Sequence, residues 1–173
     1  MQRVKIEELT LRPFHLLDRE WALLVGGRPR PNPMTVSWGG LGTLWNRPVA
    51  TVYVRPTRFT FGLLNEEPSF TLNFMPEELR PALDYCGANS GAEVDKWAAT
   101  GLQPVPSATV PVPQVADAQL VLECRVLATL DLDPARFLDP TLEGLYPRKD
   151  YHRVFLGAVL AVWAGARFLG GAS

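Results

Sequence analysis

The feature that most constrains the fold of this chain is a long alternation of apolar and polar residues from Ala118 to Asp133. Every even position in this stretch is apolar, while polar or charged residues such as Glu123 and Arg125 occupy most odd positions. A period of two places successive side chains on opposite faces of a β-strand. The stretch therefore predicts one long strand with one buried face.

Glycine and proline are frequent, with 14 glycines and 16 prolines among 173 residues. They fall between short apolar runs and leave little room for long helices, because both residues disfavour helix interiors. Together with the long alternating strand, this composition predicts a turn-rich, mainly β fold. The length suits one domain with its own core, so we expect a single domain over residues 1–173.

A second long strand is predicted from Tyr151 to Trp163, with apolar residues on both faces after Arg153. Such a strand needs cover on both sides, and a subunit interface is one candidate for part of that cover. Shorter strands are predicted at residues 21–25, 34–41, 48–54 and 69–74. Because strands outnumber helices and several connections are longer than hairpins, a Greek-key-like barrel fits better than a simple meander.

Three short helices are predicted between the strands, at residues 57–64, at residues 77–86 and after a capping box at residues 90–93. Thr57 is expected to cap the first helix. Pro81 must fall in the first turn of the second helix, which therefore begins late. Gly87 and Gly101 are expected to end the second and third helices.

Charge is nearly balanced: the chain has 17 lysines and arginines and 18 acidic residues, which gives a net charge of −1. This balance argues against nucleic-acid binding through bulk positive charge and against a polybasic membrane anchor. The longest apolar run, at residues 154–166, is shorter than the about 20 residues that cross a bilayer. No secretory signal is visible, and Cys86 and Cys124 form no CxxC motif, so we expect a cytoplasmic protein with reduced thiols.

Common catalytic motifs are absent, including the Walker loop, HExxH and GxSxG. The two histidines, His15 and His152, and the lack of an acidic pair at ligand spacing predict no metal site. The segment 39–42 is rich in glycine but lacks the helix and the acidic residue of a dinucleotide-binding fingerprint. We interpret it as a bent strand that another group approaches closely.

Polar residues gather at two predicted helix starts and on one strand. Residues 55–60 place two cations and two hydroxyls where free N–H groups could hold a phosphate, and a capped helix with solvated arginines is the alternative. Ser90 and Lys96 stand at a second helix start, for which a plain capping box is the alternative. Thr35 and Ser37 alternate with apolar residues, so both hydroxyls lie on one strand face.

Longer segments carry a pattern that is specific in its order and spacing: Asn32–Gly42, Leu44–Ala50, Tyr53–Thr60, Cys86–Lys96, Leu130–Pro134 and Asp150–Arg153. Over about Glu20 to Trp163, the chain resembles the flavin reductase-like family of FMN-binding split β-barrels, and its flavoredoxin-type branch in particular. The resemblance implies a mainly β, Greek-key split barrel with short inserted helices.

The resemblance also implies an FMN site with residues in four groups. Those along the ring and ribityl chain would be Asn32, Thr35, Ser37 and Trp38. Those holding the phosphate would be Arg55, Thr57, Arg58 and Thr60. Those closing the site from the inserted helices would be Cys86, Ser90 and Lys96, with Lys96 at the electron-accepting end of the flavin. His152 would come from the neighbouring subunit, and a purely structural histidine is the alternative.

The function implied by the resemblance is an FMN-binding oxidoreductase, in which NADH or NADPH visits as a transient substrate and reduces FMN. Electrons then pass to free flavin or to another redox partner, and no catalytic acid or base from the protein is needed. The expected assembly is a homodimer with the flavin near its interface. Two alternatives stay open: a flavoredoxin-type FMN electron carrier reduced by a protein partner, and a barrel that has lost its flavin.

Overall fold

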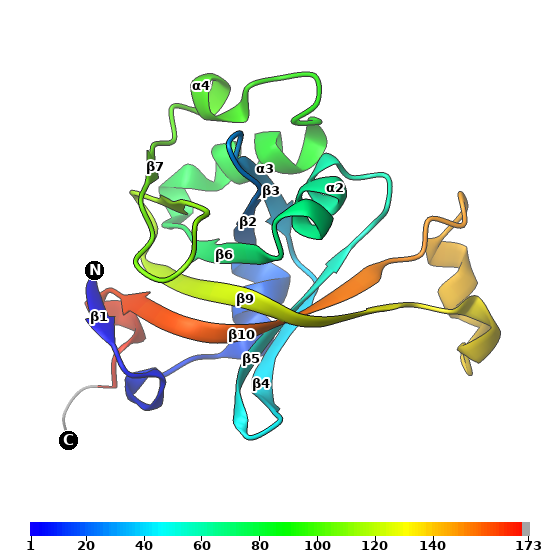
Figure 1. Ribbon diagram of the computed structural model, residues 1–173, viewed down its shortest axis with the longest axis horizontal. Helices are drawn as coiled ribbons and strands as arrows, with labels where there is room; N and C mark the ends of the chain where they lie inside the picture. Colours follow the sequence, from blue (N-terminus) through cyan, green and yellow to red (C-terminus); the bar gives the residue numbers. More distant parts are fainter. Residues whose placement is uncertain (171–173) are drawn as a thin grey trace.

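The computed structural model describes residues 1–170, and a large antiparallel sheet forms its centre (Figure 1). Its strands are β1 (Gln2–Val4), β2 (Ala22–Gly26), β3 (Asn32–Val36), β4 (Gly39–Leu44), β5 (Arg47–Val54), β6 (Ser69–Phe74), β9 (Leu120–Asp131) and β10 (Arg153–Ala164). The strand order is β3-β2-β6-β9-β10-β5-β4, and β1 also pairs with β10. A separate small hairpin joins β7 (Pro104–Val105) to β8 (Gln114–Val115). The predicted mainly β split barrel is confirmed.

The two ends of this strand order are consecutive in the sequence, because only Ser37 and Trp38 separate β3 from β4. The single strand predicted at residues 34–41 is therefore wrong. β3 pairs with β2 at one end of the strand order, and β4 pairs with β5 at the other end. The chain therefore cannot continue as one paired strand from β3 into β4. This link carries Ser37 and Trp38 from one edge strand of the sheet to the other.

The long strand β9 confirms the predicted alternation, with Leu120, Leu122 and Cys124 in the main core. The expectation of a single buried face is wrong for its first half, because Val121 and Glu123 on the opposite face are also fully buried. The segment that follows α4 covers this face. Its backbone and side chains donate hydrogen bonds to the Glu123 carboxylate, for example from the Thr109 amide at 2.6 Å.

The last long strand, β10, is buried on both faces from Val154 to Ala158 within the chain itself, whereas Leu160 is exposed. Phe155 belongs to the main core, and Val154 and Leu156 pack with Val49 in a separate cluster on the other face. An added Cβ at Gly157 would lie 2.5 Å from the ring of Phe70, so this close approach requires glycine.

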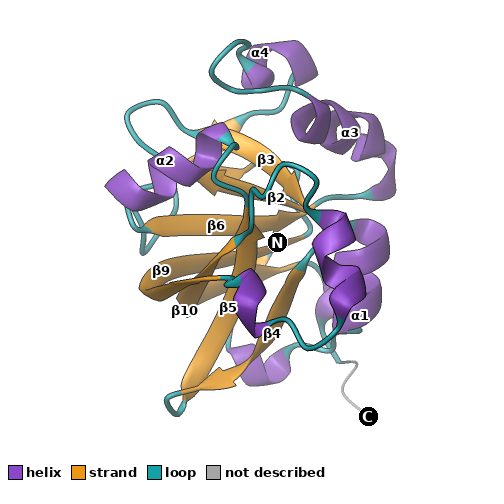
Figure 2. Ribbon diagram, turned by 90° about the vertical axis from the view of Figure 1, so that its right-hand side faces the viewer, coloured by secondary structure: helices purple, strands orange, loops and turns teal. Residues whose placement is uncertain are grey.

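Short helices and helical turns connect the strands: α1 (Pro13–His15), α2 (Phe59–Glu66), α3 (Arg80–Ala88), α4 (Lys96–Thr100), a π-helical turn at Leu16–Glu20, and 3-10 turns at Ile6–Glu8, Glu77–Leu79, Pro134–Arg136, Pro140–Leu145 and Ala166–Phe168. Helices α2, α3 and α4 gather at one end of the sheet, near β2 and β3 (Figure 2). The segment between β9 and β10, residues 132–152, extends away from the rest of the molecule (Figure 1). We call this segment the arm.

The helix starts and ends differ from the prediction in detail. Helix α2 begins after Arg58 with no side-chain cap, so Thr57 is not its cap. Helix α3 has Pro81 in its first turn as predicted, but it continues through Gly87. An added Cβ at Gly87 would lie 3.3 Å from Cβ of Thr35, so this glycine permits close packing of α3 on β3 instead of ending the helix.

The predicted capping box at residues 90–93 is also corrected. Helix α4 is capped by Asp95, whose carboxylate accepts a hydrogen bond from the Ala98 amide at 3.1 Å. The Ser90 hydroxyl accepts from the Ala92 amide at 3.3 Å within a turn before the helix. Gly101, with φ at 74°, ends the helix as predicted. In residues 1–170, no helix is both long and apolar enough to cross a membrane.

Candidate functional site

Three adjacent hollows form a groove along β3, the end of β5 and the base of the arm. We call them the wide hollow, of about 600 Å³, the middle hollow, of about 190 Å³, and the narrow hollow, of about 50 Å³. The residues that line both the wide and middle hollows are Ser37, Trp38, Tyr53 and His152. The middle and narrow hollows share Met34 and Arg58. The groove therefore runs from the base of the arm to the start of α2.

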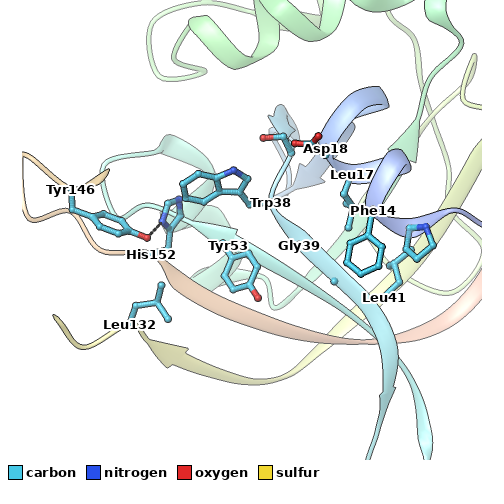
Figure 3. A pocket seen from close by; sticks show the side chains of 13 residues that line it. Phe14, Leu17, Asp18, Trp38, Gly39, Leu41, Tyr53, Leu132, Tyr146 and His152 are labelled. Carbon is cyan, nitrogen blue, oxygen red and sulfur yellow. Dashed lines mark hydrogen bonds between the residues drawn. The ribbon is translucent and has the colours of Figure 1, made fainter. Parts of the chain in front are cut away.

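The wide hollow is mainly apolar and aromatic (Figure 3). Its large side chains come from separate parts of the sequence: Phe14, Leu17, Trp38, Leu41, Tyr53, Leu132 and Tyr146. Among the described residues, only Asp18 and His152 contribute ionisable acidic or basic side chains of the Asp, Glu, Lys, Arg or His type to its lining. A flat apolar ring system fits such a surface better than a highly charged group does.

The narrow hollow is polar and lies where β3, the start of α2 and the segment after α3 meet. Its polar lining residues are Asn32, Thr57, Arg58, Thr60, Asn89, Ser90 and Lys96. Arg58 is exposed, and its Nη1 donates to the Gly87 carbonyl at 3.1 Å, which holds the guanidinium between α2 and α3. Two cations beside several hydroxyls give this end of the groove the donors that an oxyanion requires.

A buried hydrogen bond shapes one wall of the narrow hollow. Asn32 donates from Nδ2 to Oγ1 of Thr60 at 2.8 Å, and both side chains are buried. An added Cβ at Gly91 would lie 1.9 Å from Oδ1 of Asn32. Gly91 is therefore required for this wall, a role that the helix-cap interpretation of residues 90–93 did not include.

Lys96 is buried and lines the narrow hollow. Its Nζ donates to the carbonyls of Pro33 at 3.0 Å and of Cys86 at 2.7 Å. Burial lowers its pKa, with a smaller lowering from the charge of Arg58. A lysine ammonium has three N–H donors, so two carbonyls leave one donor for a ligand.

Cys86 and Thr35 contribute less to the groove than expected. The Cys86 side chain is buried in the core cluster below α3 and lines none of the three hollows, and burial raises its pKa to about 11. Thr35 lines the middle hollow, but its hydroxyl donates to the Leu83 carbonyl. Ser37 lines both the wide and the middle hollow, as the strand pattern suggested.

Arg55 lines the middle hollow but is engaged by the arm. Its Nη1 donates to Oδ1 of Asp150 at 2.7 Å and its Nη2 to the Leu145 carbonyl at 3.0 Å. Its guanidinium carbon lies 4.7 Å from the ring centre of Tyr146. Burial alone would raise the pKa of Asp150, but hydrogen bonds and the charge of Arg55 outweigh it and hold that pKa below its usual value.

His152 lines the wide and middle hollows of its own chain. Its Nδ1 is 2.9 Å from the Tyr146 hydroxyl, and its ring centre is 5.2 Å from that of Trp38 (Figure 3). Burial, together with the positive charge of Arg55, lowers the pKa of His152 to about 4. The imidazole is therefore neutral at pH 7 and forms part of an aromatic wall.

The lining residues of the wide hollow that the sequence did not identify include Phe14, Tyr53, Leu132 and Tyr146. Tyr53 and Leu132 stand inside segments that carry the family resemblance, which was a usable signal. Phe14 and Tyr146 lie outside those segments.

The glycine-rich segment 39–42 was interpreted as a strand that another group approaches closely. At Gly39 and Gly40 the approaching group is Thr51 of the neighbouring strand, whereas nothing lies within 4 Å of a Cβ added at Gly42.

The described part of the chain has no group of three or more His, Cys, Asp or Glu side chains that could hold a metal ion. The groove instead has a graded chemistry, with cations and hydroxyls at one end and apolar aromatic surface at the other. That gradient matches a long ligand with an anionic end and a flat end.

Comparisons with solved structures agree with the fold described above. A flavoredoxin from Methanosarcina acetivorans is 24% identical, with a TM-score of 0.70 over 98% of this chain and 79% of its own. An FMN-binding protein from Thermus thermophilus, solved with bound 1-cyclohex-2-enone, is 25% identical, with a TM-score of 0.66 over 95% of this chain and 80% of its own. An NADH:FAD oxidoreductase from Streptomyces globisporus is 18% identical, with a TM-score of 0.68 over 88% of this chain and 82% of its own.

The family comparison is more direct than the structural ones. The model of the flavin reductase-like domain matches residues 21–170, which include β2 to β10 and every lining residue of the middle and narrow hollows. The chain therefore belongs to the flavin reductase-like family.

Proposed function

We propose that this protein binds FMN in the groove and works as an oxidoreductase that passes electrons from NADH or NADPH through the flavin to a second acceptor. The observation that carries the proposal is the chemical gradient of the groove, from cations in the narrow hollow to aromatic surface in the wide one. Family membership and flavin-binding relatives such as the Thermus thermophilus protein support the choice of cofactor.

The groove residues fit the three parts of FMN in order. Arg58, Lys96 and Thr57 would hold the phosphate in the narrow hollow, where charge-assisted hydrogen bonds are available. Thr35 and Ser37 would line the ribityl chain in the middle hollow. The ring would lie in the wide hollow, so Lys96 would be a phosphate residue and not a ring residue in this arrangement.

When bound, the flavin would supply the capacity to accept and release a hydride or electrons. The protein's own contribution would be to bind, orient and cover it. Trp38 and Tyr53 would pack on the ring, and the neutral His152 would support Trp38 without adding charge. No protein acid or base is assigned a catalytic role.

The first test is the visible spectrum of the purified protein and its change on adding NADH or NADPH under anaerobic conditions. We expect a yellow protein whose flavin absorbance bleaches rapidly with one of the two nucleotides. Protein that remains colourless and does not quench FMN fluorescence would show that the barrel does not bind flavin. FMN binding without reduction by either nucleotide would remove the reductase activity from the proposal.

A flavoredoxin-type electron carrier is the second candidate, and one observation favours it. The wide hollow, where a nicotinamide would meet the ring, offers no lysine or arginine among its described lining residues. A nicotinamide dinucleotide carries phosphates that such cations commonly hold. Stopped-flow reduction separates the two functions, because a carrier would react slowly with both nucleotides and quickly with a reduced protein partner.

We also propose a homodimer that covers the open side of the groove. Two large apolar side chains that line the groove are exposed, Phe14 by 91% and Trp38 by 47%, and so are Leu130 near the end of β9 and Leu138 in the arm. Exposed apolar patches of this kind commonly mark interfaces. Light scattering after size-exclusion chromatography should give twice the chain mass, and a stable flavin-loaded monomer would contradict the dimer.

A cytoplasmic location is part of the same proposal. Cys86 and Cys124 are both free and buried in different core clusters. Free buried thiols suit a reducing compartment. Fractionation of the native host, with an antibody against this protein, tests the location directly.

A further inference from the structure

Within the described chain, the hydrogen bonds, the ion pair and the ring contact of the Arg55 guanidinium are all made with the arm. The Asp150 carboxylate, the Leu145 carbonyl and the Tyr146 ring surround it, and all belong to the arm. Arg55 and Asp150 are 95 positions apart in the sequence, and their side chains are only 26% and 12% exposed. A guanidinium that is fixed on several sides in this way holds two segments together.

We propose that Arg55 is a positioning residue, which holds the arm so that Tyr146 and His152 form a wall of the wide hollow, and that it does not bind the cofactor phosphate. The effect on flavin rests on the proposed function. The contact between Arg55 and the arm does not rest on it, and it can be measured without any ligand.

The contacts from Arg55 to the wide hollow are continuous. Arg55 fixes Asp150, Leu145 and the ring of Tyr146. The Tyr146 hydroxyl meets Nδ1 of His152 at 2.9 Å, and the His152 ring packs on Trp38 with ring centres 5.2 Å apart. Loss of Arg55 therefore removes the support of Tyr146 first, and then the support of the wall that Tyr146 and His152 form.

The base of the arm is held separately from its outer part. Arg153 donates to both carboxylate oxygens of Asp131, at 2.7 and 2.8 Å, where the arm leaves β9 and enters β10. The Leu132 amide donates to the His152 carbonyl at 3.0 Å at the same place. Arg55, with a weaker contribution from Thr57 at 3.4 Å from Asp150, fixes the part that carries Tyr146. Loss of the Arg55 side chain can therefore release Tyr146 while β10 stays folded.

Charge also argues against a phosphate role for Arg55. Its positive charge is already paired with Asp150, so a phosphate placed beside it would meet a carboxylate 2.7 Å from the guanidinium. The narrow hollow is lined by Arg58 and Lys96 but not by Arg55. The sequence expectation grouped Arg55 with Arg58 because the two residues are close in the chain, and the structure gives them different partners.

The experiment compares Arg55→Ala with the matched variant Arg58→Ala, using FMN and riboflavin as probes and hydrogen–deuterium exchange of the arm as a ligand-free readout. Riboflavin lacks the phosphate, so it separates phosphate contacts from all others. Arg55→Ala should weaken FMN and riboflavin by the same factor, about tenfold, and speed amide exchange in residues 139–150. Arg58→Ala should weaken FMN alone and leave the exchange of the arm unchanged.

Two further variants keep the test decisive if Arg55→Ala folds poorly. Arg55→Lys keeps a positive charge but cannot reach Asp150 and the Leu145 carbonyl together, so it should still loosen the arm. The exchanged pair Arg55→Asp with Asp150→Arg should restore both the protection of the arm and riboflavin affinity toward those of the unaltered protein.

The opposite pattern would overturn the proposal. If Arg55→Ala weakens FMN but not riboflavin, and the arm exchanges at its original rate, Arg55 is a phosphate ligand. If the unaltered protein binds neither flavin, the proposed function fails, while amide exchange still shows whether Arg55 holds the arm.

Discussion

The two ends of the groove differ in how they are built. The narrow hollow is formed by three short runs of neighbouring residues, in β3, at the start of α2 and between α3 and α4, and its walls include hydrogen-bonded polar groups. The wide hollow takes its apolar side chains from widely separated segments, including α1, β4 and the arm. One end can therefore be disrupted by losing a single hydrogen bond or charge, and the other depends on how distant segments pack.

The largest effect is expected from Gly91→Ala, at the narrow end. The new Cβ would lie 1.9 Å from Oδ1 and 2.6 Å from Cγ of Asn32, which is held by its bond to Thr60. Overpacking of this kind costs about 1–3 kcal/mol, and we expect the upper end because Asn32 is buried. Chemical denaturation should show the loss of stability, and FMN and riboflavin should both bind poorly.

Gly62→Ala is the matched control for that prediction. Gly62 lies inside α2, and nothing is within 4 Å of a Cβ added there. Alanine in a helix interior is favoured over glycine by about 1 kcal/mol, so this variant should be as stable as the original protein or more so. Equal stability of the two alanine variants would show that Asn32 can move freely and that the narrow wall is soft.

The next largest effect is expected from combining Thr57→Val with Arg58→Ala. These changes remove a hydroxyl and a cation from the narrow hollow, and neither residue lines the wide hollow. The weak contact of Thr57 with Asp150 is lost, but Arg55 still holds the arm. Each charge-assisted hydrogen bond contributes about 1.5–3 kcal/mol, so FMN affinity should fall by about 100-fold while riboflavin affinity stays nearly constant. Fluorescence titration with both flavins measures this ratio.

Arg125→Ala is the control for charge alone, because Arg125 is exposed on β9 and lines none of the three hollows. It should change neither flavin's affinity. Equal loss of FMN and riboflavin in the Thr57 and Arg58 double variant would place the phosphate elsewhere and reverse the assignment of the two ends.

The same contrast explains what could be predicted from the sequence. Local rules predict the extent of most strands, so β6 at Ser69–Phe74 matches its prediction and β9 differs in extent only at its ends. They did not predict the break at Ser37 and Trp38 or the burial of the second face of β9. Arg58 and Thr60 at the narrow end were found because they stand at one predicted helix start. Local patterns were sufficient wherever a site is built from neighbours in the chain.

Sequence patterns were insufficient where two local solutions compete or where distant segments meet. Ser90 and Asp95 are both good helix caps, and the structure uses Asp95, because α4 begins at Lys96, whose side chain is tied to the carbonyls of Pro33 and Cys86. The pairing of Arg55 with Asp150 spans 95 positions and has no local signature. For the same reason, Tyr146 could not be assigned to the wide hollow before the fold was known.

A pH effect of intermediate size should come from His152 at the wide end. Its pKa is lowered from 6.5 to about 4 in the folded protein. Between these two values, the unfolded chain binds a proton on this imidazole that the folded chain does not bind. The free energy of unfolding should therefore fall as the pH is lowered through this window, by about 2 kcal/mol.

Replacing this histidine by glutamine tests the origin of the effect, because His152→Gln keeps a hydrogen-bonding side chain that does not titrate. Denaturation curves from pH 6.5 down to pH 4.5 should lose most of their slope in this variant, while His15→Gln at the surface should retain it. If the pH dependence of stability persists in His152→Gln, the acid sensitivity comes from other groups, and the claim that His152 is neutral in the folded protein loses its support.

The smallest effect is expected from Trp38→Leu. This change tests whether the wide hollow binds the ring through apolar contact and not through specific hydrogen bonds. Trp38 is 47% exposed and packs on His152, so its indole offers a face to a ring without any required hydrogen bond. An aromatic pair contributes about 0.5–1.5 kcal/mol beyond its buried area, so FMN and riboflavin affinity should each fall by up to about tenfold, and by the same factor. Trp45→Leu removes an indole of similar exposure from the β4–β5 turn, outside all three hollows, and should change the affinity for neither flavin. If Trp38→Leu weakened FMN more than riboflavin, the indole would act near the phosphate, and the two ends of the groove would not be independent.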